Sequence, residues 1–210
     1  MPHPRPEPPT LRVLGVDPGL ADVGYGLIDW QGTRRRGSLV AYGVIQTPPG
    51  TPLAQRLDTI YQSLAELIET HRPDAVAVEQ LYFARNVKTA MVVAHGRAAC
   101  ILATARRRIE LFEYTPLQIK QALTGHGRAG KAQVQMMVRA VLGLETIPRP
   151  DHAADALAAA LCHAHSLMFR DKVDQAARRA AAAAADSSGD GQDPRKLLLA
   201  RARRNGRKRR

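Results

Sequence analysis

The sequence has only two cysteines, Cys100 and Cys162, and no apolar run of eighteen residues. Two cysteines in apolar surroundings are too few for a disulfide framework, and buried thiols in a reducing compartment are the simpler interpretation. A membrane span needs a longer apolar run, and the first ten residues, with five prolines, lack the apolar region of a signal peptide. These absences predict a cytoplasmic protein that is neither exported nor inserted into a membrane.

Acidic residues are scarce relative to basic ones, and the net charge is +12. Residues 171–210 carry twelve Lys or Arg and five Asp, and residues 11–170 still hold a net charge of +5. Because both parts are basic, a polyanion such as nucleic acid is the expected partner. Charge alone does not exclude a basic protein without such a partner.

The length of 210 residues corresponds to one domain with an ordinary core. Residues 1–10 form a Pro-rich arm that we expect to be disordered. Residues 169–210 are also expected to be disordered, with an Ala-rich piece that has helical potential and a basic end that adds sequence-independent affinity for phosphates. The ordered domain is therefore predicted over residues 11–168.

The apolar pattern of this domain predicts three strands joined by tight turns, followed by alternating strands and helices. This order is typical of an α/β fold, with a mixed five-stranded sheet that has antiparallel and parallel parts and is flanked by helices. The strands are expected at residues 11–16, 24–30, 39–45, 75–79 and 109–114, and the helices at residues 53–68, 86–106, 115–123, 131–144 and from 151 onward.

Two carboxylates interrupt the apolar pattern at the ends of strands. Asp17 ends the run LRVLGV, and Glu79 ends the run AVAV. An unpaired carboxylate pointing into a core is costly, and a cation is its natural partner because carboxylates are hard oxygen ligands. Taken singly, a turn-forming Asp and a strand-end charge remain the simpler interpretations.

A third acidic residue, Asp155, lies near the start of an Ala- and Leu-rich helix, three residues after His152. This spacing places both side chains on one face of the helix. By itself an acid there is favoured by the helix dipole. Together with the two strand-end acids, however, it suits Mg²⁺ or Mn²⁺. Two such ions about 4 Å apart activate water and stabilise the leaving oxygen in phosphodiester cleavage.

Four segments together span nearly all of residues 11–168 in order and spacing: GVDPGLADVGYG, VEQLYFARN, FEYTPLQIKQALTGHGRAGKAQVQMMV and HAADALAAALCHAH. In these segments the chain closely resembles the RuvC family of Holliday-junction resolvases. The resemblance implies a ribonuclease-H-like fold and a homodimer that places symmetrical nicks in four-way junction DNA during recombination and repair. It also implies divalent metal, Mg²⁺ or Mn²⁺ with two ions per active site, and the RuvA–RuvB branch-migration complex as a partner.

By position, Asp17, Glu79 and Asp155 match the catalytic carboxylates of that family. The fourth acidic position, usually Asp, is His152 in this chain. The expected catalytic and metal-binding set is therefore Asp17, Glu79, His152 and Asp155. Asp151 is a competing candidate for the fourth position, although its place after Pro150 favours a helix N-cap.

The resemblance also assigns DNA contacts to a loop after Glu79 and to later basic residues. Tyr82 or Phe83 would stack on unpaired bases, which tolerates many sequences, and the alternative is that both rings belong to the core. Lys120 and Lys131 match family residues near the scissile phosphate. The complete set of expected DNA-binding residues is Tyr82, Phe83, Arg85, Lys88, Lys120, Arg128 and Lys131.

Other classes of protein fit the sequence less well. The segment GHGRAGKA resembles a phosphate-binding loop, but Ala132 replaces the required hydroxyl and a helix is expected before it. An actin-like kinase would need a second Asp- and Gly-rich hairpin. A non-catalytic junction-binding protein of the same fold is the main alternative, and converging carboxylates argue against it. We predict no zinc site at Cys162, His163 and His165, which point in different directions around their helix.

Overall fold

The computed structural model describes residues 10–32, 36–80 and 87–188. The chain divides into one unit up to Met168, which contains the sheet, and a second unit from Phe169. In the described part of the chain, every helix is too short or too polar to cross a membrane. Cys100 and Cys162 are buried free thiols, as expected, and burial raises the pKa of each to about 12.

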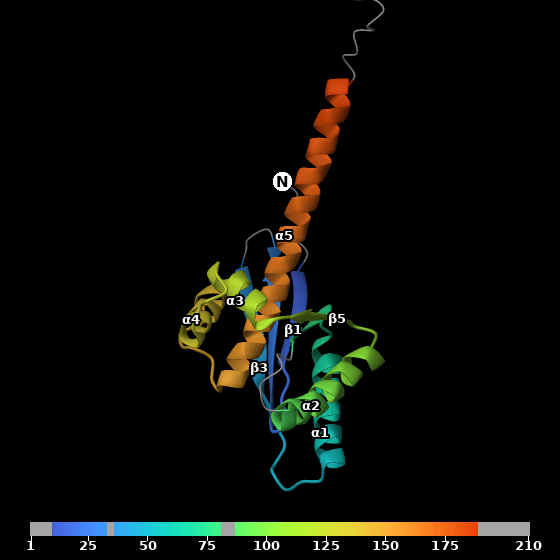
Figure 1. The fold of residues 1–210 in the computed structure, drawn as a ribbon, viewed down its shortest axis with the longest axis vertical. Coiled ribbons are helices and arrows are strands. Elements are labelled where there is room, and N and C mark those ends of the chain that lie inside the picture. Colours follow the sequence, from blue (N-terminus) through green and yellow to red (C-terminus); the bar gives the residue numbers. More distant parts are fainter. Residues whose placement is uncertain (1–9, 33–35, 81–86, 189–210) are drawn as a thin grey trace, which may run out of the picture. The chain divides into compact units, whose positions relative to one another are not determined.

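The described strands form one mixed sheet with the order β3-β2-β1-β4-β5 (Figure 1). The strands β1, β2 and β3 pair antiparallel, whereas β4 pairs parallel with both β1 and β5. This arrangement confirms the α/β fold with a mixed five-stranded sheet. The bounds are β1 (Thr10–Asp17), β2 (Asp22–Gln31), β3 (Arg36–Gln46), β4 (Ala75–Glu79) and β5 (Glu110–Tyr114).

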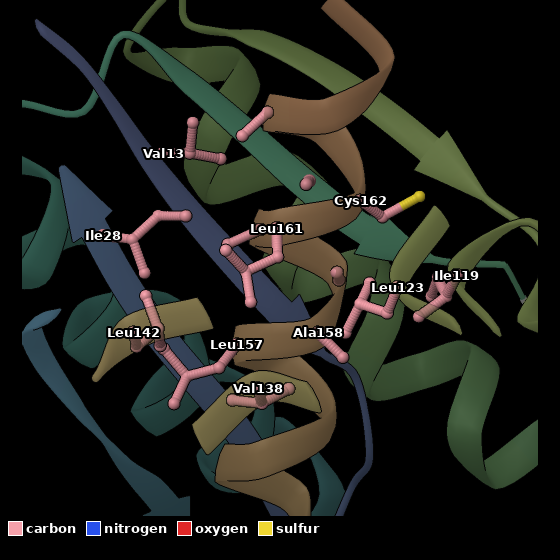
Figure 2. Packing of buried hydrophobic residues seen from close by; sticks show 14 of the residues in the cluster. Val13, Ile28, Ile119, Leu123, Val138, Leu142, Leu157, Ala158, Leu161 and Cys162 are labelled. Atoms are coloured by element: carbon pink, nitrogen blue, oxygen red, sulfur yellow. The ribbon is translucent and has the colours of Figure 1, made fainter. Parts of the chain in front are cut away.

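Helices cover both faces of the sheet. One apolar core joins the sheet to α3, α4 and α5, and Figure 2 shows its side chains between α5 and the strands. A second core joins the other face to α1 and α2. The bounds are α1 (Leu53–His71), α2 (Val87–Arg106), α3 (Pro116–Thr124), α4 (Lys131–Leu142) and α5 (Asp151–Ser188). The Ala-rich segment is thus helical as far as Ser188, and the limits of the ordered domain stay predictions.

The start of α3 shows how local sequence sets these helices. The Thr115 hydroxyl accepts a hydrogen bond from the Gln118 backbone N–H, and the Gln118 side chain accepts one from the Thr115 backbone N–H. This capping box, followed by Pro116 in the first turn, satisfies N–H groups that a helix otherwise leaves unpaired. The helix ends at Thr124 and is capped by Gly125, whose φ of 81° is readily adopted by glycine.

The helix α5 lies directly on the sheet because β2 has a glycine beneath its first turn. A Cβ atom added to Gly24 would lie 2.0 Å from the carbonyl oxygen of His152. Such a contact is sterically impossible, so any other residue at this position would push α5 away from the sheet. Since Gly24 pairs with Asp17 across the β1–β2 ladder, the close approach brings His152 to Asp17.

Candidate active site

Asp17 and Glu79 are brought together by the register of β1 and β4. In this parallel pair Gly15 lies opposite Ala77, and Val16 lies opposite Val78. The next step of the register sets Asp17 beside Glu79. Since side chains alternate along a strand, both acids share the face of Ala77, which packs in the core with α5.

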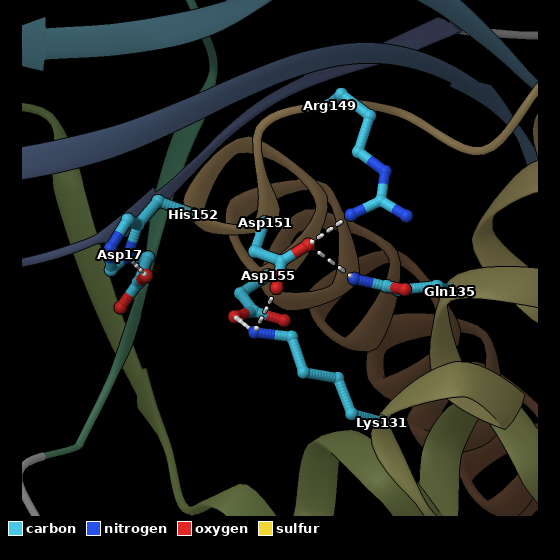
Figure 3. Close-up of polar contacts among 7 residues, drawn as sticks. All are labelled: Asp17, Lys131, Gln135, Arg149, Asp151, His152 and Asp155. Carbon is cyan, nitrogen blue, oxygen red and sulfur yellow. Dashed lines mark hydrogen bonds and ion pairs between the residues drawn. The ribbon is translucent and has the colours of Figure 1, made fainter.

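The first turns of α5 place His152 over Asp17 (Figure 3). The Nδ1 atom of His152 lies 2.7 Å from Oδ2 of Asp17, whose side chain is only 19% exposed. When Nδ1–H donates to this carboxylate, Nε2 carries the lone pair of the neutral ring. His152 is therefore equipped both to orient Asp17 and to accept a proton or bind a metal ion through Nε2.

Asp155, on α5, is the third acid of the site. It lines a pocket of about 260 Å³ together with Glu79, Lys120 and Lys131, and the pocket wall is otherwise apolar. The Lys131 ammonium group donates to Oδ2 of Asp155 at 3.0 Å. The structure thus brings together the four predicted catalytic residues and two of the predicted DNA-binding lysines.

The acids at this site carry an electrostatic penalty. The pKa of Glu79 is raised to about 7, mainly by burial and then by the charges of Asp17 and Asp155, which outweigh the opposite effect of Lys120 and Lys131. Burial also raises the pKa of Asp17, against the hydrogen bond and charge of His152. Asp17 and Glu79 are therefore harder to ionise than in water, and a nearby cation would favour their ionised forms.

The donor set fits a divalent metal ion in its chemistry. Three carboxylates and one imidazole are ligands of Mg²⁺ or Mn²⁺. As the side chains are placed, however, no three His, Cys, Asp or Glu residues within residues 10–32, 36–80 and 87–188 are grouped as one ion-binding cluster. Oδ2 of Asp155 instead accepts a hydrogen bond from Lys131, so this ammonium group competes with a metal ion for that oxygen.

Asp151 faces away from Asp17. Its Oδ1 atom accepts hydrogen bonds from Gln135 at 3.1 Å and Arg149 at 3.0 Å, and its Oδ2 atom lies 3.2 Å from the Lys131 ammonium group (Figure 3). Hydrogen bonds from Lys131 and Gln135, with the Lys131 charge, hold the pKa of Asp151 below its usual value. These contacts favour His152 over Asp151 as the fourth active-site group.

The N-cap interpretation of Asp151 was wrong by one residue. Asp151 is the first residue of α5, and the carbonyl of Pro150 accepts the N–H groups of Ala153 and Ala154. Pro150 therefore holds the N-cap position, and the Asp151 side chain is available for contacts with α4.

The remaining predicted DNA-binding residues are less defined. Arg128 is exposed in the connection between α3 and α4. Tyr82, Phe83 and Arg85 lie outside the residues that the structure describes, and so does the side chain of Lys88 in α2. Their roles in binding DNA stay predictions.

Arg97 of α2 supports Glu79 and was missed in the sequence. Its guanidinium donates to the Glu79 carbonyl at 2.8 Å and pairs with Glu113 of β5 at 2.6 Å, with only 11% of its side chain exposed. One residue earlier, a Cβ on Gly96 would lie 1.9 Å from the Gly19 carbonyl oxygen, so glycine at this position allows α2 to pack closely against the turn after β1. An arginine in the middle of an apolar helix, next to that glycine, was the available signal.

The two histidines at which no zinc site was predicted, His163 and His165, make hydrogen-bonding contacts within the fold. His163 is buried, and its Nδ1 atom lies 2.8 Å from the Tyr114 hydroxyl. His165 donates from Nδ1 to the Ala122 carbonyl at 3.0 Å. The segment that resembled a phosphate-binding loop joins two helices, α3 and α4, and so lacks the strand that such a loop follows.

The mixed sheet, with acids at the ends of β1 and β4 and at the start of α5, defines a nuclease of the ribonuclease-H-like class. The family model for crossover junction endodeoxyribonuclease RuvC matches residues 13–163. The chain belongs to the RuvC family. Crossover junction endodeoxyribonucleases RuvC from Heliobacterium modesticaldum and Rubrobacter xylanophilus are 54% and 53% identical to it, over 76% and 73% of this chain and 97% and 85% of theirs.

Solved structures agree with this assignment. The Thermus thermophilus RuvC structure is 38% identical, covers 76% of this chain and 96% of its own, and superposes with a TM-score of 0.72. The T. thermophilus RuvC in complex with a Holliday junction substrate gives a TM-score of 0.73 with the same identity and coverage. Nucleases of this family are metal-dependent in general.

Proposed function

We propose that this chain resolves four-way DNA junctions by metal-dependent hydrolysis of phosphodiester bonds. The main support for the proposal is the convergence of Asp17, Glu79 and Asp155 from three separate elements, with His152 hydrogen-bonded to Asp17. A site that only bound junctions would not need buried carboxylates whose ionisation is opposed. The T. thermophilus relative bound to a Holliday junction supports the choice of substrate.

In this proposal Asp17, Glu79, Asp155 and His152 bind Mg²⁺ or Mn²⁺, with two ions per active site. When bound, the metal supplies an activated water and stabilises charge on the phosphate. His152 orients the Asp17 carboxylate through Nδ1–H and presents Nε2 as a ligand or proton acceptor. Lys120 and Lys131, which line the pocket, would balance phosphate charge.

Symmetrical nicking of a four-way junction requires two active sites, so a homodimer is the proposed acting form. Tyr82 and Phe83 would stack on bases at the crossover, with Arg85, Lys88 and Arg128 contacting phosphates. The basic tail, residues 171–210, would add phosphate affinity. The RuvA–RuvB branch-migration complex is the proposed protein partner, and the cytoplasm is the proposed location.

A cleavage assay tests the proposal. The unmodified chain is incubated with a labelled four-way junction, a linear duplex and an RNA–DNA hybrid, each with Mg²⁺, Mn²⁺ or EDTA. We expect paired nicks in the junction alone, dependent on metal and lost in Asp17→Asn. Nicking of the RNA–DNA hybrid in preference to the junction would overturn the choice of substrate.

The same assay distinguishes the alternative, a non-catalytic junction-binding protein. Such a protein would shift the junction in a gel but leave it intact with either metal. The family of this chain, named for endodeoxyribonuclease activity, and the full set of acids favour the enzyme.

A further inference from the structure

Lys131 is shared by two carboxylates of α5. Its ammonium nitrogen lies 3.0 Å from Oδ2 of Asp155 and 3.2 Å from Oδ2 of Asp151. Residues four apart lie on the same side of a helix, so the two carboxylates are neighbours and can bind one ammonium group together. Figure 3 shows Lys131 between them, reaching across from α4.

Asp151 is held in place by groups outside the catalytic set. Gln135, which is only 7% exposed, donates to Oδ1 of Asp151, and Arg149 donates to the same oxygen. A buried amide on a helix has little freedom to move, so the orientation of Asp151 is set from the interior of the protein. Its second oxygen, Oδ2, is thereby directed to Lys131.

Asp155 has two competing roles. It accepts a hydrogen bond from Lys131, and the proposed function requires the same carboxylate for a metal ion. An ammonium group and a divalent cation repel each other strongly at short range in a partly buried site. When Asp155 serves a metal ion, Lys131 needs another anionic partner to stay beside the pocket.

We propose that Asp151 is a positioning residue that retains the Lys131 ammonium group beside the active site while Asp155 binds a divalent cation. The inference rests on the proposed nuclease function. Asp151 acts through Lys131 and is not itself a metal ligand, because both of its oxygens already have partners. Lys131 contacts Oδ2, and Gln135 and Arg149 donate to Oδ1. Lys131 thus stays available for the phosphate without competing for Asp155.

Mn²⁺ binding without DNA tests this role. Free Mn²⁺ is measured by electron paramagnetic resonance for the unmodified chain, Asp151→Asn, Lys131→Ala and the double variant. Asn keeps an acceptor for Gln135 and Arg149 but lacks the charge that attracts Lys131. Asp151→Asn should weaken Mn²⁺ binding about 10-fold, because Lys131 then rests on Asp155 alone.

The double variant decides between a positioning residue and a ligand. If Asp151 acts through Lys131, Lys131→Ala binds Mn²⁺ at least as tightly as the unmodified chain, and the double variant equals it. A double variant as weak as Asp151→Asn would overturn the inference and make Asp151 a metal ligand. Unchanged binding by Asp151→Asn would overturn it as well.

A matched control removes an acid at the other end of the sheet. Glu110→Gln, at the exposed start of β5, changes the net charge equally and should leave Mn²⁺ binding unchanged. Failure of the proposed function would appear separately, as a lack of junction nicking by the unmodified chain with any metal. The Mn²⁺ comparison among the variants does not depend on that result.

Discussion

The two ends of the strand β1 differ in how their charged side chains are paired: one holds an arginine–carboxylate pair and the other holds neighbouring carboxylates. Near its start, Arg12 donates to both oxygens of Asp29 at 2.7 and 2.8 Å and to the His71 carbonyl at 3.0 Å. The Arg12 backbone N–H donates to Asp74 at 2.7 Å. The hydrogen bond and charge of Asp29 outweigh burial and raise the pKa of Arg12, so the guanidinium is stabilised in its charged form.

At the other end of the same strand, Asp17 lies beside a second carboxylate, that of Glu79, instead of a guanidinium group. Burial raises the pKa of both acids, and each of these carboxylates is further opposed by Asp155. The Arg12–Asp29 pair at one end of β1 therefore stabilises the fold. At the other end, the ionised Asp17 and Glu79 carboxylates lower its stability in the absence of metal. Such a penalty is typical of an active site.

The largest effect should come from neutralising a strand-end acid. Asp17→Asn and Glu79→Gln should each lower junction nicking by roughly 1000-fold or more, because they remove a metal ligand. Junction binding should change little, since phosphate contacts by Lys and Arg supply most of the affinity. Single-turnover cleavage and gel shifts measure the two quantities. Undiminished cleavage by Asp17→Asn would contradict the assignment of this end as catalytic.

The next effect concerns His152, which takes the place of the usual family Asp. His152→Ala should reduce nicking by about 10- to 100-fold or more, because Asp17 loses its hydrogen bond and the site loses a donor. His152→Asp should retain most activity, because a carboxylate is again a metal ligand. Normal cleavage by His152→Ala together with an inactive Asp151→Ala would assign the fourth position to Asp151 instead.

A smaller effect should appear in the stability of the metal-free protein. The pKa of Glu79 is about 7 in the fold and 4.5 as its reference value, so the unfolded chain releases this proton at lower pH. Stability is therefore lost as pH rises from about 4.5 to 7, by roughly 2 kcal/mol after allowing for partial exposure. Glu79→Gln should lack this loss.

Urea unfolding in EDTA at several pH values checks that prediction. The free energy of unfolding of Glu79→Gln, relative to the unmodified chain, should increase across this interval and then level off. Saturating Mn²⁺ should reduce the difference, because the ion stabilises the ionised form. A difference that is constant with pH would show that Glu79 ionises normally in the fold.

The smallest effect should come from the paired end. Arg12→Met should lower the free energy of unfolding by about 1 kcal/mol, because Asp29 and the His71 carbonyl lose a partly exposed partner. Nicking of the junction should stay within about 2-fold, since Arg12 is at the end of β1 opposite Asp17. Thermal unfolding and the cleavage assay measure both. A large loss of activity in a folded Arg12→Met protein would contradict the separation of the two ends.

Much of the fold could be predicted because its elements are encoded locally. Apolar runs of strand length, helical periodicity and Gly- or Pro-rich turns placed the described strands and the starts of the described helices to within a few residues. The end of α5 was not placed, because this helix continues to Ser188 whereas disorder was expected from residue 169. Asp17 and Glu79 could be singled out because each directly follows a run of four buried residues at the end of its strand. The spacing of His152 and Asp155 on one helix was equally local.

The contacts among these residues could not be predicted in the same way. Arg97 reaches Glu79 across eighteen positions of the chain, and Lys131 reaches Asp151 and Asp155 across more. The sequence placed Asp151 and His152 side by side and left the fourth position open. The structure turns His152 to Asp17 and Asp151 to Gln135, since neighbouring residues on a helix point about 100° apart.

By itself the sequence determined which side chains were out of place, because hydrophobic patterning is a property of a few successive residues. It determined the strands, the helices and the acids at their ends. Only the tertiary structure decided that β4 pairs with β1, so that Asp17 lies beside Glu79, and that Gly24 lets α5 approach closely enough for His152 to contact Asp17. Strand order and helix docking depend on packing between distant segments, and local sequence does not record that packing.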